Sequence, residues 1–222
     1  MSHKQIPLEL DHQPSYALED FLVAGSNEAA FAMLDSWPAW PHHAVALVGP
    51  EGSGKSHLGR SWASRVGAHM LTLDDKAVTL KDQSCIFIED ADAINYDQDC
   101  LFHLFNWAKE TDGHLLFTAR SAPSLWTVDL PDLRSRLATL PVTHISPPDD
   151  LLLSAIFIKL FSDRQLQVDL TLVDYLLPRM ERSFSGAQRL VDALDKTALA
   201  KKARITKVLA RDVLQTMAVE GE

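Results

Sequence analysis

Short apolar runs alternate with segments of helical periodicity over the first two thirds of the chain. The clearest run, Ala-Val-Ala-Leu-Val at residues 44–48, ends at Gly49-Pro50, and a helical pattern follows from Lys55 to about Val66. Further strands are predicted near residues 69–73, 84–88, 114–118 and 142–145, and further helical segments over 15–35, 98–112 and 131–138. Such alternation is typical of a parallel sheet covered on both faces. We therefore expect an α/β domain over residues 15–146.

The pattern changes at the segment Ser-Pro-Pro-Asp-Asp, residues 146–150. Beyond it only helical periodicity is found, and helices are expected over residues 149–164, 169–181, 185–202 and 206–218. We therefore place a small all-helical domain at residues 147–222. Residues 1–14, which are rich in Pro, His, Gln and Asp, are expected to form a flexible tail.

Composition and charge narrow the class of protein. The 222 residues are 46% hydrophobic and 23% charged, and no apolar run approaches the roughly 18 to 20 residues of a membrane helix. No secretory signal precedes the first helix, so we expect a cytoplasmic protein with no membrane partner. The net charge of −9 disfavours a surface for the phosphate backbone, so no direct sequence-specific DNA binding is expected. The two cysteines, Cys85 and Cys100, suit buried thiols.

The segment after the first strand matches the phosphate-binding pattern G-x-x-x-x-G-K-[ST], and it lies between a strand and a helix as that motif requires. Gly52 and Gly54 let the backbone curl around phosphate oxygens, Lys55 reaches the β- and γ-phosphates, and the Ser56 hydroxyl is a ligand for Mg²⁺. His57 lies either near the phosphates or on the helix surface. The residues expected to bind ATP or ADP are Gly49, Pro50, Glu51, Gly52, Ser53, Gly54, Lys55, Ser56 and His57.

A second acidic motif follows about thirty residues later, where the apolar run Cys-Ile-Phe-Ile ends in Glu89-Asp90. A strand that ends in two acids is the form of a Walker B element, which orients Mg²⁺ and polarises the attacking water. By their order, Glu89 is assigned to the metal with Ser56, and Asp90 to the water as a catalytic residue. Read alone, the same string is also typical of a strand that runs into a solvated turn.

Four further segments resemble the AAA+ module of the bacterial DnaA initiators, and more closely their relatives of the Hda type, the regulatory inactivators of DnaA. The similarity covers residues 5–218, nearly all of the chain. Residues 16–27 resemble the entry motif in which Phe21 and Leu22 flank the adenine. Residues 115–123 resemble the sensor 1 strand, and residues 130–137 the arginine-finger segment, which indicates Arg136. Residues 185–194 resemble the sensor 2 helix, where Gln188 or Arg189 would approach the γ-phosphate.

The resemblance implies a P-loop AAA+ three-layer sandwich with a parallel sheet, followed by a helical lid. It also implies DnaA as a partner, and it leaves a homodimer open. Three positions depart from the family's pattern. The acids stand in the order Glu89-Asp90, and the sensor 1 register gives Thr118-Ala119-Arg120 where a small polar residue or Asp is expected. The expected sensor 2 arginine aligns with Gln188, and Arg189 follows one residue later. One residue turns a side chain by about 100° around a helix. We therefore expect weak intrinsic ATP hydrolysis and a protein that holds ADP.

The tail contains the string Gln-Ile-Pro-Leu-Glu-Leu, with Gln5, Leu8 and Leu10 spaced along it. It resembles the peptide with which proteins of the Hda type bind the DNA polymerase III sliding clamp, its β subunit. An extended peptide can place the two leucines in an apolar groove and the glutamine amide in a polar pocket. Taken alone, the string is also compatible with an unspecific tail.

Three functions remain open on the sequence. The first is a regulator of replication initiation that binds adenine nucleotide and the DNA-loaded clamp and stimulates ATP hydrolysis by DnaA through Arg136. The second is an initiator or helicase-loader ATPase that itself engages DNA; DnaA carries a helix-turn-helix domain after its lid, and the sequence given ends at Glu222, which favours the regulator. The third is a degenerate ATPase that acts as an ADP-bound adaptor.

Overall fold

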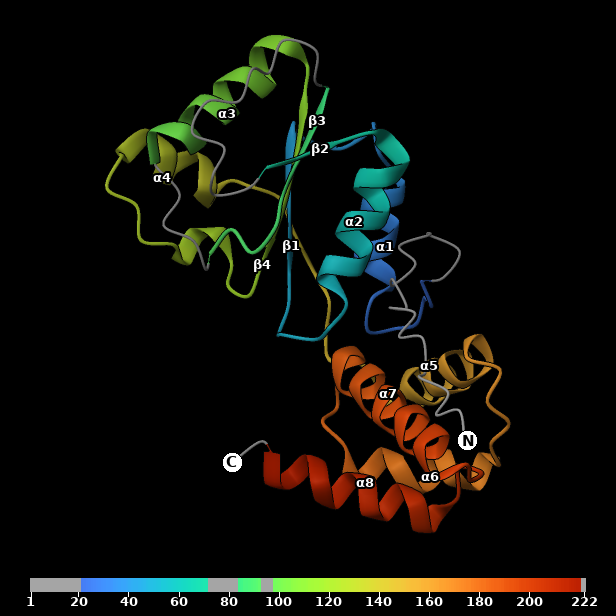
Figure 1. Ribbon diagram of the computed structural model, residues 1–222. Helices are drawn as coiled ribbons and strands as arrows, with labels where there is room; N and C mark the ends of the chain where they lie inside the picture. The colour runs from blue at the N-terminus through green and yellow to red at the C-terminus, as the bar shows by residue number, and fades with distance from the viewer. Residues whose placement is uncertain (1–20, 72–83, 93–97, 221–222) are drawn as a thin grey trace, which may run out of the picture.

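The computed structural model describes residues 21–71, 84–92 and 98–220, in which the chain forms a parallel sheet between helices (Figure 1). The strands are β1 (Ala44–Val48), β2 (His69–Leu71), β3 (Cys85–Ile88), β4 (His114–Ala119) and β5 (Val142–His144). They pair in the order β2-β3-β4-β1-β5, and every pairing is parallel. The predicted α/β class is confirmed, and each strand ends within two residues of its expected position.

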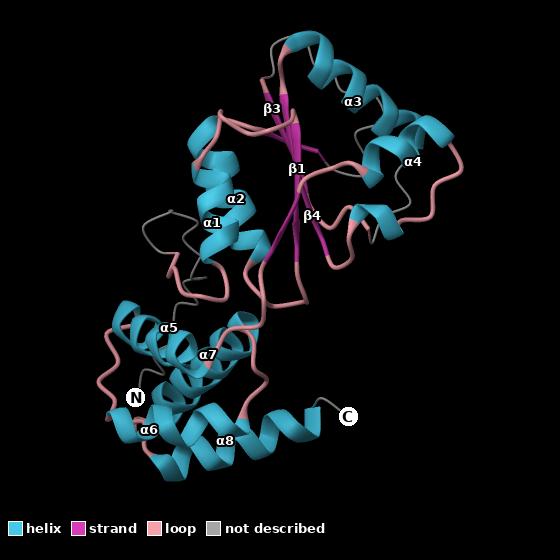
Figure 2. Cartoon of the chain, turned by 180° about the vertical axis from the view of Figure 1, so that it is seen from behind, coloured by secondary structure: helices cyan, strands magenta, loops and turns pink. Residues whose placement is uncertain are grey.

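Helices cover both faces of this sheet. Helices α1 (Glu28–Asp35) and α2 (Lys55–Val66) lie on one face, and α3 (Gln98–Thr111) and α4 (Pro131–Ala138) on the other, as Figures 1 and 2 show from opposite sides. Along β1, Val45 and Leu47 belong to the core beneath α1 and α2, whereas Ala46 and Val48 belong to the core beneath α3 and α4. A strand buried on both faces must be apolar at every position, and this is why the continuous apolar run predicted β1 from the sequence.

A helical group follows the sheet and lies below it in Figure 1. Its members are α5 (Asp150–Asp163), α6 (Leu170–Leu176), the 3₁₀ turn η3 (Leu177–Arg179), α7 (Phe184–Lys201) and α8 (Lys207–Glu220); a second 3₁₀ turn, η2 (Pro123–Leu125), follows β4. Asp149, Asp169 and Ser183 each accept a backbone N–H at the start of α5, α6 and α7. The apolar faces of these helices form a core of their own.

Two helix predictions were too long. The expected helix over 169–181 ends at Leu176 and continues only as a 3₁₀ turn, because Pro178 has no N–H to donate to the preceding turn. The expected helical segment over 15–35 is helical only from Glu28, among the described residues. Before it, the Asn27 side chain accepts the N–H of Ala24 and donates to the carbonyl of Leu22, which holds a turn in place of a helix.

Within the described part of the chain, we find no helix with the length and apolar character that crossing a membrane requires. The tail residues Gln5, Leu8 and Leu10 lie outside the described residues.

Candidate nucleotide-binding site

The loop between β1 and α2 carries the phosphate-binding motif at the carboxyl end of a central strand. Every residue of β1 is buried, which fixes where the loop begins. Gly52 and Gly54 have φ angles of 70° and 100°, a left-handed backbone that residues with a side chain rarely adopt. Gly54 directly precedes α2, and no side chain caps the helix N-terminus. The first N–H groups of α2 are therefore available to an anion.

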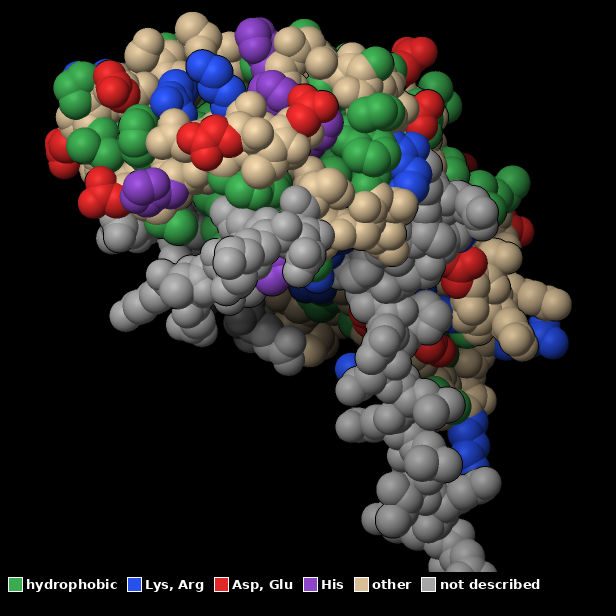
Figure 3. Space-filling model, turned by 90° about the horizontal axis from the view of Figure 1, so that it is seen from above, with side chains coloured by type: hydrophobic (Ala, Val, Ile, Leu, Met, Phe, Trp, Pro, Cys, Tyr) green, Lys and Arg blue, Asp and Glu red, His purple; other side chains and the backbone are tan. Residues whose placement is uncertain are grey.

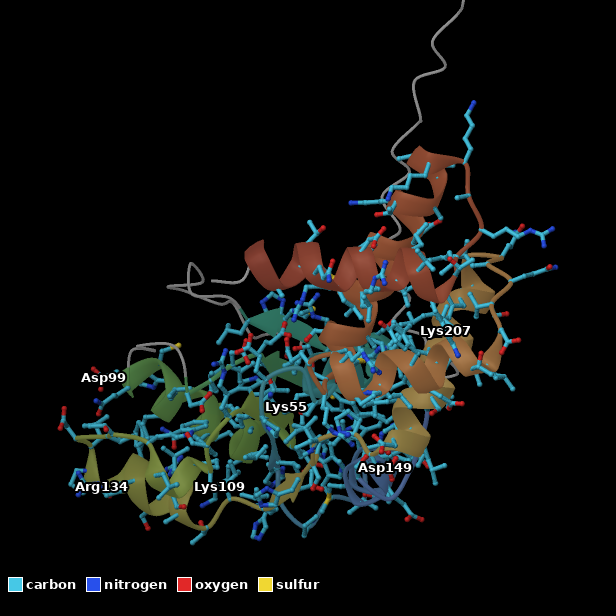
Figure 4. The ribbon with its side chains drawn as sticks, turned by 90° about the horizontal axis from the view of Figure 1, so that it is seen from below. Lys55, Asp99, Lys109, Arg134, Asp149 and Lys207 are labelled. Atoms are coloured by element: carbon cyan, nitrogen blue, oxygen red, sulfur yellow. The ribbon has the colours of Figure 1, made fainter. Side chains whose placement is uncertain are left out.

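Lys55 lies at the centre of this site (Figure 4). Its side chain is buried, with 5% of the residue exposed, and its ammonium donates to the carbonyl of Pro50 at 2.8 Å. Burial lowers the pKa of Lys55 below its ordinary value, and the carboxylate of Asp90 opposes that shift. A buried cation with little solvation gains more from an incoming phosphate than an exposed one does.

A hollow opens beside the loop, between the sheet domain and the helical group. It combines aromatic and aliphatic side chains with the loop backbone, and it is lined by Phe21, Leu22, Asn27, Ser53, Gly54, His57, Pro148, Leu152, Ile156, Lys159, Leu160, Asp163, Arg164, Phe184 and Gln188. The His57 ring contacts the rings of Phe21 and Phe184, at centroid distances of 5.6 and 5.9 Å. Apolar rings beside a phosphate-binding loop suit a flat heteroaromatic base.

The helical group touches the loop directly at the N-terminus of α7. The N–H of Phe184 donates to the carbonyl of Gly52 at 2.8 Å, and a Cβ at Gly52 would lie 2.6 Å from the Cβ of Ser183. Gln188, one turn further along α7, faces the hollow. Arg189 does not, because its exposed side chain pairs with Glu181. Of the two sensor 2 candidates, only Gln188 lines the hollow.

The acids after β3 are held by different partners. Asp90 has a φ of 49°, and its N–H donates to the hydroxyl of the fully buried Thr118 on β4 at 2.9 Å. Glu89 instead accepts two bonds from the Arg60 guanidinium of α2, at 2.7 and 3.1 Å. Thr118 therefore positions the loop that carries Asp90.

Two carboxylate contacts hold the end of β4, and sequence reasoning missed both. Asp92 accepts the backbone N–H groups of Arg120 and Ser121 at 2.8 and 2.7 Å. The Arg120 guanidinium pairs with Glu51 of the phosphate-binding loop at 3.0 Å. No short motif marks these residues, since Asp92 and Arg120 are separated by a helix and a strand. Their link ties the end of β4 to the loop.

Arg136 lies away from this site. It is half-buried on α4, against the face of the sheet opposite α2; its guanidinium donates to Asn106 of α3 at 2.8 Å and lies over the Phe102 ring at 4.6 Å. Arg134, two residues earlier, donates to the carbonyl of Val128 and lies at the outer edge of the molecule in Figure 4. The sequence-predicted site is thus divided between two faces of the sheet.

Arg136 borders a second hollow, which we call the Arg136 hollow. It is lined by His42, His43, Ala44, Phe105, Ala108, Lys109, Arg136, Thr139, Leu140 and Pro141. It lies at the amino ends of β1 and β5, the end of the sheet farther from the helical group. Figure 3 looks onto this end and shows histidine side chains with both basic and acidic side chains nearby. Lys109 and Arg136 are the cations in the lining, and His43 of the lining pairs with Asp112.

The residues of the loop fit the phosphates of a nucleotide. The Ser53 hydroxyl is buried with no hydrogen-bond partner in the described residues, and the nearest atom to a Cβ at Gly54 would be Phe21 Cε2, 3.8 Å away. The loop thus offers an unsatisfied polar atom and open space beside uncapped N–H groups, as a phosphate site does. A metal there would be held by the Ser56 hydroxyl and the carboxylates that follow β3.

Comparison with known proteins supports the fold. No family model matches the chain. It is similar to the chromosomal replication initiator DnaA of Campylobacter curvus, with 23% identity over 238 residues, 93% of this chain and 54% of that protein. The chain thus spans about half the length of the DnaA proteins that it matches.

Solved structures give the architecture. Domain III of the Thermotoga maritima DnaA superposes with a TM-score of 0.78 at 17% identity, covering 92% of this chain and 97% of that one. A replication initiator DnaA bound to AMPPCP and single-stranded DNA superposes with a TM-score of 0.67 at 18% identity, covering 86% of this chain and 69% of that one. The chain has the AAA+ fold: a parallel five-stranded sheet between helices, followed by a helical group.

Proposed function

We propose that this protein is a cytoplasmic, nucleotide-bound AAA+ regulator of chromosomal replication initiation that stimulates ATP hydrolysis by DnaA. One observation carries the proposal: Arg136 is held half-buried on the face of the sheet opposite its own phosphate-binding loop. A cation so placed can act on a nucleotide only in another molecule. The similarity to DnaA supports that protein as the partner.

Chemically, Arg136 acts as an arginine finger. Phosphoryl transfer from ATP builds negative charge between the β- and γ-phosphates, and a guanidinium that neutralises this charge lowers the barrier. The contacts to Asn106 and Phe102 use one N–H and one face of the guanidinium, so that further donors remain for a phosphate. Holding the group before the partner arrives reduces the entropy lost on docking.

The protein's own nucleotide has a different role in this proposal. Lys55 and the N–H groups of α2 bind the phosphates, Phe21 and Leu22 contact the adenine, and Mg²⁺ is held beside Ser56. Bound nucleotide links the sheet domain to the helical group, because residues of both line the hollow. We expect ADP to persist there, since Glu89 is engaged by Arg60 and the sensor 2 position carries Gln188.

The tail provides the second partner in this proposal. Gln5, Leu8 and Leu10 dock on the sliding clamp, which brings Arg136 to DnaA at loaded DNA. Replacing all three residues by Ala should remove clamp binding in a pull-down and leave ADP affinity unchanged. A triple variant that still binds the clamp would contradict this part of the proposal alone.

The decisive experiment measures hydrolysis of DnaA-bound ATP with and without this protein, the clamp and DNA. We expect stimulation that requires all three additions. If DnaA is unaffected and this protein's own hydrolysis responds to single-stranded DNA, the alternative function of a DNA-engaging initiator or helicase loader is supported instead.

A further inference from the structure

A glycine lets α2 approach the sheet closely beside the candidate site. A Cβ at Gly59 would lie 2.6 Å from the ring of Phe87 on β3 and 3.3 Å from the methyl group of Thr118 on β4. Any larger residue at this position would push the helix away from both strands. The next residue along α2, Arg60, is therefore brought to the end of β3.

Arg60 uses this position to hold Glu89. Its Nε and Nη2 both donate to the same carboxylate oxygen, Oε2, at 3.1 and 2.7 Å. The side chains are 37% and 21% exposed, so the pair is open to water and can exchange partners. Arg60 also lies one helical turn after Ser56, and residues four apart share one face of a helix. The guanidinium and the Ser56 side chain therefore lie on the same face of α2, one turn apart.

The neighbouring acid is held quite differently. Asp90 has its backbone fixed by Thr118, and its carboxylate lies near enough to Lys55 to oppose the effect of burial on that lysine. Asp90 thus faces the phosphate-binding loop, whereas Glu89 is turned toward an arginine. In a metal site, a carboxylate that is already neutralised by a guanidinium is a poorer ligand for a divalent cation.

We infer that Arg60 competes with Mg²⁺ for Glu89 and so weakens metal binding at this protein's own nucleotide. The inference rests on the nucleotide site of the proposed function. Arg60 is a positioning residue in this account, since it acts through Glu89. Its effect keeps one Walker B acid away from the metal while Asp90 and Ser56 remain beside the phosphates. Opening the pair releases Glu89 to the metal.

The test uses Mn²⁺ as a probe, because it accepts the same oxygen ligands as Mg²⁺ and its free form is counted by electron paramagnetic resonance. Mn²⁺ affinity is measured on the ADP complex of the full chain for wild type, Arg60→Gln, Glu89→Gln and the double variant. We expect Arg60→Gln to tighten Mn²⁺ binding about fivefold, and to change it by less than twofold when Glu89 is already Gln. Arg65→Gln is the matched control, because Arg65 lies on the same helix and pairs with Asp35.

These four proteins form a double-mutant cycle. It distinguishes competition of Arg60 with the metal for Glu89 from direct charge repulsion between Arg60 and the metal. Equal tightening in both backgrounds, or no tightening in either, would overturn the inference. If Arg60→Gln does not fold, Arg60→Lys replaces it; that variant keeps the charge but loses the two-pronged contact, and tightening that depends on Glu89 is again required. Wild-type protein that fails to bind ADP at all would overturn the nucleotide site itself, whereas ADP binding without coupling between the two residues would overturn only the role of Arg60.

Discussion

Two cations of this protein, Lys55 and Arg136, are held in opposite ways. Lys55 is buried within its own loop, where it bonds to a carbonyl five residues earlier and its pKa is lowered by burial. Arg136 is half-buried on the other face of the sheet and is held by Asn106 and Phe102, thirty or more residues away. The first can serve only a ligand that enters the loop.

In the proposed function both groups act on phosphate, Lys55 on the protein's own nucleotide and Arg136 on that of a partner. The difference in how they are held would keep the two roles apart. A loop of contiguous residues folds around its own ligand, whereas a side chain fixed by neighbouring helices can be presented outward. The sheet between them separates the two sites (Figure 2). If the comparison is right, each cation can be removed without disturbing the other.

The largest effect is expected from Arg136→Ala. Stimulated hydrolysis of DnaA-bound ATP should fall by a factor of about 10³ to 10⁵, the range that an arginine finger supplies. ADP and clamp binding by this protein should not change, because Arg136 lies away from its own loop. Arg134→Ala is the control, since it is two residues along the helix and turned by about 200°. Loss of stimulation with Arg134→Ala alone would show that the finger is Arg134.

The second prediction removes the other cation, by the substitution Lys55→Met. We expect ADP affinity, measured by calorimetry, to fall about 100-fold, because a charge-assisted contact to phosphate is lost. The same variant should raise the free energy of unfolding of the nucleotide-free protein by about 1 kcal/mol, since a poorly solvated charge is removed. Equal ADP affinity in variant and wild type would contradict the proposed site.

The pH dependence of folding stability tests independently whether the charge of Lys55 destabilises the folded protein. The folded pKa lies below the ordinary value of 10.5, so the unfolded chain binds this proton more tightly. In wild type, the Lys55 contribution to stability therefore rises as the pH rises through the folded pKa toward 10.5. Chemical denaturation across this range should show that rise in wild type and a flatter curve in Lys55→Met.

A smaller effect is expected from Asn106→Ala, which keeps the Arg136 side chain but removes the hydrogen bond that holds its guanidinium. Stimulated DnaA hydrolysis should fall about tenfold in its maximal rate, with the half-saturating concentration of this protein unchanged, because a misplaced catalytic group loses rate before it loses docking. Glu110→Gln, at an exposed position of α3, is the matched control. A change in half-saturation alone would indicate a docking residue.

The smallest effect concerns His114, which contacts His43 at the edge of the Arg136 hollow. Burial lowers the pKa of His114, and His43 lowers it further. The unfolded chain therefore binds this proton more readily, and stability should fall as the pH drops from 7 to 5. His114→Asn should flatten this dependence, as denaturation at both pH values would show. The exposed His144→Asn is the control, and ADP affinity should stay constant in all three proteins.

The sequence by itself determined the sheet, the helices beyond it and the position of the phosphate-binding loop. These features are written in contiguous residues: β1 is apolar at every position because both of its faces are covered, and the glycines follow it directly. At Asn27 the hydrophobic pattern predicted the wrong local structure. Its side chain makes a turn from residues that looked helical, and hydrogen bonds of this kind are not visible in periodicity.

Only the tertiary structure decided which partners the charged side chains take. Glu89 and Asp90 are neighbours in the chain, yet one is held by α2 and the other by β4. Arg136 and Arg189 were both candidates for a contact with phosphate in the sequence, but one borders a hollow beside α3 and the other pairs with Glu181 at the surface. Charge pairing depends on distances of a few ångströms between elements far apart in the chain, and those distances are set by packing, such as the contact of Gly59 with Phe87, that no local pattern encodes.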